Sequence, residues 1–87
     1  MDAIQKIITG VYIDLDKIVA ITPLINRDTF YDCLIHFQLM SEPLKIDLFD
    51  VFKPDETGYG VRLSEQEREE EYNKIINLWM AYKKSKL

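Results

Sequence analysis

The C-terminal stretch, residues 64–87, constrains the fold most, because its sequence marks where a helix starts and which side it buries. Ser64 is a favoured N-cap residue, and Glu67 three positions later completes a capping-box pattern. Apolar side chains then recur at steps of three and four residues, the period of a helix with one buried side. This stripe consists of Tyr72, Ile75, Ile76, Trp79 and Tyr82, whereas Leu78 and Met80 fall outside it. Those two residues either widen the buried side or form a second contact.

Charges are ordered along the same stretch. Residues 64–71 carry five acids and one base, and residues 72–87 carry four bases and no acid. Glutamates are favoured at the partly positive start of a helix, and lysines are favoured at its end. The sequence therefore predicts a long C-terminal helix with an acidic start and a basic end. Its acids are Glu65, Glu67, Glu69, Glu70 and Glu71, and its last lysines are Lys83, Lys84 and Lys86.

The 87 residues are expected to form a single domain, mainly β over 1–63 and helical over 64–87. A net charge of −4 disfavours direct binding to duplex nucleic acid, which needs clustered lysine and arginine. Cys33 is the only cysteine, so the chain cannot form an internal disulfide. The sequence shows no targeting segment and no apolar run long enough to span a bilayer, so we expect a cytoplasmic protein without membrane partners.

The first third of the chain has β-type patterns. Residues 2–8 fit either one or two helical turns or the lead-in to a strand, and Gly10 breaks that segment. Alternation over residues 11–15 predicts a strand, followed by a turn over 14–17. Residues 18–22 form a second β-rich run, which Pro23 stops, and 24–29 are expected to be a loop. This loop would be the wide connection of a hairpin.

Residues 30–40 form the longest strand candidate. Alternation places Cys33, Ile35, Phe37 and Leu39 on one side, and Leu34, His36 and Met40 on the other. A turn over 41–43 then leads to a strand over 44–52, giving a second hairpin. Residues 53–63 are expected to be an irregular connection.

Strands followed by one long helix indicate an α+β fold. We expect a small antiparallel sheet of about four strands, in two hairpins, packed by the C-terminal helix, with a possible short helical turn at the N-terminus.

No catalytic residue is assigned. His36 is the only histidine, and Cys33 lies on the opposite side of the same strand, so the two do not form a local pair. Cys33 fits a buried core position, and no neighbouring cation would make it a reactive thiolate. His36 is interpreted as a structural or exposed strand residue.

No metal or cofactor is assigned either. Asp14, Asp16, Asp47 and Asp50 lack the spacing of a calcium loop, and aspartates in turns commonly bond to local backbone. Gly58 and Gly60 flank Tyr59, but the phosphate-binding lysine and further glycines of nucleotide loops are missing.

Apolar residues on both sides of the sheet are the main functional indication. Phe49 and Val51 lie on the strand side opposite Leu44 and Ile46, and a single helix covers one side only. The second side either meets a protein, which includes a second copy of the chain, or is covered by residues 2–8 of the same chain.

These observations predict a non-enzymatic protein-interaction or regulatory module that forms a homodimer or docks on a protein partner. The candidate contact residues are Tyr59, Arg62, Phe49, Leu78 and Met80. Tyrosine and arginine are favoured at interfaces. One alternative is an acidic inhibitor that mimics nucleic acid in the basic groove of a nucleic-acid enzyme. A second alternative is a small enzyme whose site is built at an oligomer interface.

Overall fold

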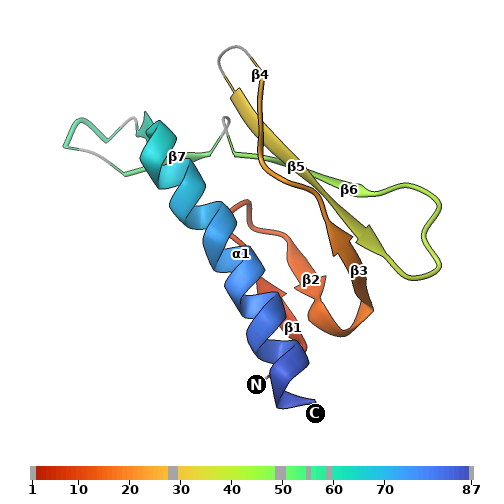
Figure 1. Cartoon of the computed structure of the whole chain (residues 1–87). Helices are drawn as coiled ribbons and strands as arrows, with labels where there is room; N and C mark the ends of the chain where they lie inside the picture. Colours follow the sequence, from red (N-terminus) through yellow and green to blue (C-terminus); the bar gives the residue numbers. More distant parts are fainter. Residues whose placement is uncertain (1, 28–29, 49–50, 55, 59, 87) are drawn as a thin grey trace.

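The computed structural model describes residues 2–27, 30–48, 51–54, 56–58 and 60–86. Its elements in chain order are β1 (Ile4–Lys6), β2 (Tyr12–Asp14), the 3₁₀ turn η1 (Leu15–Lys17), β3 (Ile18–Ile21), β4 (Ile25–Arg27), β5 (Phe30–Phe37), β6 (Leu44–Asp47), β7 (Phe52–Lys53), β8 (Val61–Arg62) and α1 (Glu65–Ser85). Figure 1 shows β2 to β6 on one side of α1 and β7 beside the start of the helix. The predicted α+β class, an antiparallel sheet system with a long C-terminal helix, is confirmed.

The helix begins where the sequence predicts. The Ser64 side chain accepts a hydrogen bond from the Glu67 backbone N–H, and the Glu67 carboxylate accepts one from the Ser64 N–H. This reciprocal capping box satisfies two amides that a helix start leaves without partners. Ile75 and Tyr82 are buried, while Tyr72 and Trp79 are partly buried against the same core, so the predicted apolar stripe faces the strands.

The main sheet has four antiparallel strands. Strand β5 lies at its centre, with β3 and β4 pairing along one edge and β6 along the other. The two predicted hairpins around β5 are therefore present. Residues 24–29 were expected to be a loop, but β4 pairs with the first half of β5. Pro23 separates β3 from β4, yet both strands pair with β5, because proline is tolerated at a sheet edge.

The N-terminal segment is a strand. Ile7 N–H donates to the Val11 carbonyl and Gly10 N–H donates to the Ile7 carbonyl, so the chain reverses and β1 pairs with β2. Gly10 has φ of +88°, a conformation that glycine adopts without strain. The strand predicted over 11–15 thus belongs to this separate ribbon and not to the four-stranded sheet.

Three other expectations need correction. Strand β5 ends at Phe37, and Leu39, expected to face inward, lies fully exposed in the following turn with φ of +65°. Strand β6 ends at Asp47, after which Val51 packs against the core, so Val51 does not lie on the outer side as expected. The connection expected to be irregular over 53–63 contains β8 and the second residue of β7, and these two strands pair antiparallel.

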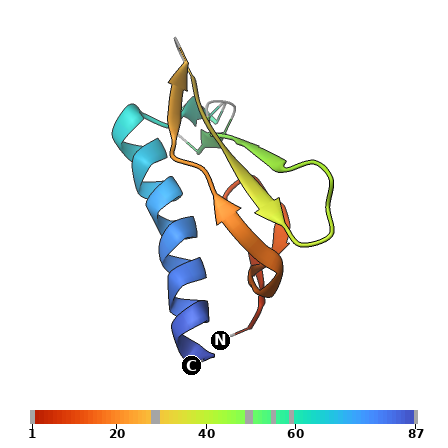
Figure 2. The same cartoon turned by 45° about the vertical axis from the view of Figure 1, so that its right-hand side comes forward.

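One hydrophobic core joins the helix, the main sheet and the N-terminal ribbon. Its buried members are Ile7, Ile13, Leu15, Ile18, Cys33, Ile35, Ile46, Leu48, Ile75 and Tyr82. The ribbon therefore packs on the inner side of the sheet, together with α1. Figure 2 shows α1 on one side of the strands and the two termini at the same end of the molecule.

Candidate interaction surface

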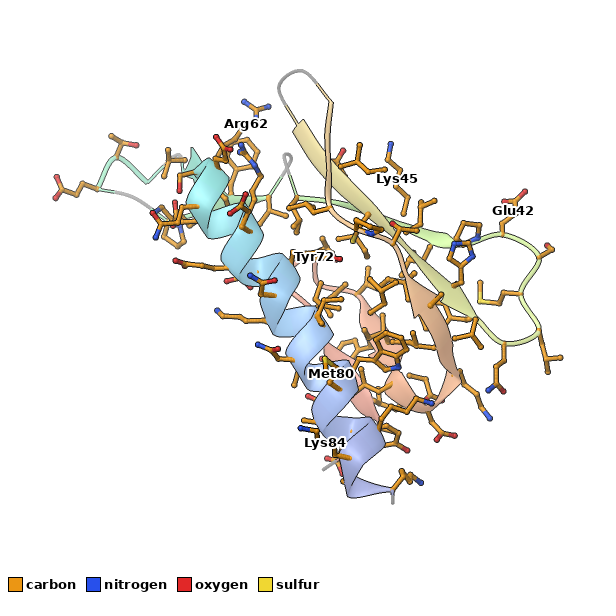
Figure 3. All side chains as sticks on the ribbon, in the orientation of Figure 1. Glu42, Lys45, Arg62, Tyr72, Met80 and Lys84 are labelled. Carbon is orange, nitrogen blue, oxygen red and sulfur yellow. The ribbon has the colours of Figure 1, made fainter. Side chains whose placement is uncertain are left out.

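The C-terminal half of α1 brings apolar side chains to the surface among lysines. Met80 is 51% exposed, and Leu78 and Trp79 are partly exposed although both also contact the core. The sequence left two roles open for Leu78 and Met80. Leu78 widens the buried side, and Met80 lies on the outward-facing side of the helix. Figure 3 shows Met80 and Lys84 on the half of α1 that leads to the C-terminus.

Two hollows flank this half of the helix. One has a volume of about 370 Å³ and is lined by Lys74, Asn77, Leu78 and Ala81. The other has a volume of about 250 Å³ and is lined by Trp79, Met80, Lys83 and Lys84. Each hollow combines apolar carbon with at least one lysine, so both are suited to a partner that presents apolar groups beside negative charge.

The acidic start of α1 is partly occupied by internal contacts. Lys53 on β7 donates to Glu67 over 2.5 Å, so this carboxylate caps the helix and also holds the β7–β8 ribbon. The Lys53 hydrogen bond, followed by those from Ser64, lowers the pKa of Glu67 to about 2. Glu71 accepts a hydrogen bond from Lys74, and this contact raises the pKa of Lys74.

Three glutamates at this end remain exposed: Glu65, Glu69 and Glu70. Glu70 accepts a hydrogen bond from Gln66, and none of the three forms an ion pair with another residue in the described part of the chain. At the opposite end of α1, Tyr82 donates to Asp16 over 3.1 Å. Hydrogen bonding with Tyr82 raises the pKa of Lys86.

The β7–β8 ribbon carries the predicted contact residue Arg62. Its guanidinium lies 5.0 Å from the ring centroid of Phe52, the residue directly opposite on the partner strand. Phe52 is 53% exposed, so the pair is a cation–π contact at the surface. Sequence reasoning placed Phe52 at the end of the strand over 44–52 and did not choose it as a contact residue, because the pairing of Phe52 with Arg62 leaves no local pattern. The other predicted contact residues, Tyr59 and Phe49, lie outside the described residues.

The N-terminal ribbon also carries exposed apolar residues that were not chosen as contact residues. Tyr12 is 67% exposed and Ile4 is 54% exposed, and Lys6 lies 6.0 Å from the Tyr12 ring. The signal was available in the strand period: these residues alternate with Gln5 and Ile13, and Ile13 is buried.

The outer face of the main sheet stays open to solvent in part. Val19 and Ala20 are exposed, and His36 and Leu34 are partly exposed. Because Ile7 joins the core on the inner side, residues 2–8 do not cover this outer face as one sequence alternative supposed. Cys33 is fully buried on the inner side, so the predicted separation of Cys33 from His36 holds.

The aspartates behave as turn residues. Asp14 accepts a hydrogen bond from the Asp16 N–H and thereby caps η1. Across the described residues, no cluster of three or more histidine, cysteine or acidic side chains has a metal-binding arrangement. Asp50 lies outside those residues. Within the same ranges, the helices fall short of the length and apolar character required to cross a membrane.

Comparison with protein-family models, with curated proteins and with solved structures found no match to this chain. The functional argument therefore depends on the surface described above.

Proposed function

We propose that this chain is a non-enzymatic protein-interaction module whose principal contact surface is the C-terminal half of α1. The observation that carries this proposal is the position of Met80, half-exposed on the outward side of the helix and lining a hollow with two lysines. Methionine adapts its shape to different partners, and a basic rim around apolar carbon favours a partner with acidic groups.

The Phe52–Arg62 pair supports a second contact at the other end of the helix. Glu67 holds the ribbon that carries this pair through its contact with Lys53. Aromatic and arginine side chains supply a large share of the binding energy at many interfaces. We therefore include Arg62 and Phe52 in the proposed contact surface, together with Leu78 and Met80.

The test compares Met80→Glu with Met40→Glu. Met40 is 59% exposed in the turn after β5, away from α1, so the control makes the same change at similar exposure. Solution mass is measured by light scattering over a dilution series, and retained proteins are compared after passing a native lysate over each immobilised variant. We expect Met80→Glu to weaken association at least tenfold and Met40→Glu to leave it unchanged. A wild-type chain that neither self-associates nor retains any protein would contradict the proposal.

A second candidate is an acidic mimic of nucleic acid, which the exposed Glu65, Glu69 and Glu70 favour. Such a complex would weaken steeply with added salt, because exposed charges are screened over roughly 8 Å at physiological ionic strength. Replacing these three glutamates with glutamine should then abolish binding to a basic partner, while Met80→Glu should have little effect. Binding insensitive to salt would reject this candidate.

A further inference from the structure

The two ends of α1 carry opposite charges that include exposed side chains. Glu69 and Glu70 are exposed near the start, and Lys83 and Lys84 are exposed near the end. Within the described part of the chain, none of these four side chains forms an ion pair. The neighbouring side chains of Glu67, Glu71 and Lys74, by contrast, already form the ion pairs described above.

The spacing of these charges fits an antiparallel pair of helices. Glu69 and Lys83 are separated by fourteen residues, as are Glu70 and Lys84. Fourteen residues make almost four turns at 3.6 residues per turn and span about 21 Å, so both charge types lie on one side of the helix. A two-fold axis near Asn77 would bring each acidic pair opposite the basic pair of another α1. Every charge contact would then occur twice, as in an isologous dimer.

The surface between the charges is compatible with this packing. Asn73, Asn77 and Met80 follow three- and four-residue steps along the outward side of α1. The hollow beside Met80, about 250 Å³ in volume, has Lys83 and Lys84 in its lining. It can receive the glutamate side chains of an antiparallel helix, with apolar contact to Met80 and Trp79.

We propose that two copies of this chain associate through antiparallel α1 helices, with Glu69 and Glu70 of each copy against Lys83 and Lys84 of the other. This inference rests on the proposed function and specifies its partner as a second copy. The outer face of the sheet presents Val19 and Ala20, but its described side chains show no comparable separation of charge that would select an occupant.

The test uses two complementary variants of the full chain. Variant A carries Glu69→Lys and Glu70→Lys, and variant B carries Lys83→Glu and Lys84→Glu. Each variant alone would place like charges together at both ends of the antiparallel pair. In a mixture of A with B, every contact is again between opposite charges, so only the mixed dimer is favoured.

By sedimentation velocity, we expect wild type to have twice the 10.3 kDa mass of one chain. Each variant alone should have the mass of one chain. An equimolar mixture should recover the dimer with at least tenfold tighter association than either variant alone. Glu42→Lys with Lys45→Glu, on the β5–β6 hairpin away from α1 in Figure 3, is a charge-swap control outside the helix and should stay dimeric. Circular dichroism establishes that each variant retains its helix.

The outcomes separate the two proposals. A wild-type monomer that still retains another protein through Met80 overturns the antiparallel dimer and leaves the proposed interaction function standing. A dimer that both charge-swap variants preserve also overturns this arrangement. A monomer that retains no protein contradicts both proposals.

Discussion

At the residue scale, Glu67 performs two tasks with one carboxylate. One oxygen caps α1 at Ser64, and the other contacts Lys53 on β7. Both contacts favour the ionised form, which is why the pKa of Glu67 falls from 4.5 to about 2. The side chain therefore couples the start of the helix to the ribbon that presents Phe52 and Arg62.

Replacing Glu67 with glutamine should reduce the acid sensitivity of folding. A lowered pKa in the folded state stabilises the protein above the unfolded pKa of 4.5, and this stabilisation is lost as the pH falls toward 2. Glutamine retains the acceptor for Ser64 but cannot titrate. Urea unfolding between pH 6 and pH 2 should show a shallower pH dependence for Glu67→Gln than for wild type. Glu65→Gln controls for removing one negative charge. The same pH dependence of the unfolding free energy in Glu67→Gln and wild type would contradict the coupling of the helix start to the ribbon through Glu67.

A second residue-scale prediction concerns the end of β5. Ile35 is fully buried, whereas Leu39 is fully exposed with a positive φ. Ile35→Ala should therefore cost about 2–5 kcal/mol of unfolding free energy, because it removes core contacts and leaves a cavity. Leu39→Gly should be neutral or stabilising by up to about 1 kcal/mol, because glycine adopts positive φ without the steric penalty. Urea unfolding measures the free energy of unfolding of both variants. A large loss of this free energy in Leu39→Gly would place Leu39 in the core.

At the element scale, the sequence predicted best where one local signal sufficed. The start of α1 and its buried side depend on a cap and a 3.6-residue period, and the inward positions Cys33 and Ile35 depend on a two-residue period. These were predicted correctly except that Leu78 packs on the core from outside the predicted stripe, and Ile76 of that stripe is not among the residues packed there. Strand ends were predicted poorly, because alternation continued through Leu39 and Val51 after pairing had stopped. The β4–β5 and β7–β8 pairs were missed although their partners are close in sequence, because strands of two or three residues are too short to show a two-residue period.

The candidate surface was predictable to a similar extent. Leu78 and Met80 were identified because they depart from the helix stripe, and Arg62 because of its residue type. The hollows beside them depend on how α1 sits among the strands, which no local pattern determines. Phe52 was not chosen as a contact residue, because its importance comes from a cross-strand neighbour.

The turn of the β7–β8 ribbon should depend on Gly60 more than the first turn depends on Gly10. Both glycines have positive φ, so alanine is strained at either position by about 1–2 kcal/mol. At Gly60 an added Cβ would also lie 3.3 Å from the Lys53 carbonyl oxygen and 3.5 Å from Phe52 Cβ, whereas at Gly10 it would meet open space. Urea unfolding should thus show a larger loss of unfolding free energy for Gly60→Ala than for Gly10→Ala. The reverse order would mean that the ribbon contributes little to stability.

At the scale of the whole molecule, the outward side of α1 and the outer face of the sheet are both surfaces that another protein could cover. The inner side of the sheet packs against α1 and the N-terminal ribbon, so the outward side of α1 and the outer face of the sheet belong to different sides of the fold. An isologous dimer through α1 closes after two copies. Self-association through both surfaces would instead extend the assembly beyond two copies, to a closed tetramer or an open array.

The assembly should therefore stop at two copies and ignore changes to the outer sheet face. Val19 is 54% exposed there, close to the 51% of Met80, so Val19→Glu and Met80→Glu place the same charge at similar exposure on opposite surfaces. We expect light scattering to give twice 10.3 kDa for Val19→Glu at every concentration where wild type is dimeric, and a mass falling toward one copy for Met80→Glu. If Val19→Glu dissociates the dimer and Met80→Glu does not, the dimer contact lies on the outer face of the sheet. A wild-type mass that grows beyond two copies with concentration would show that a contact other than the isologous α1 pair takes part, because that pair alone closes at two copies.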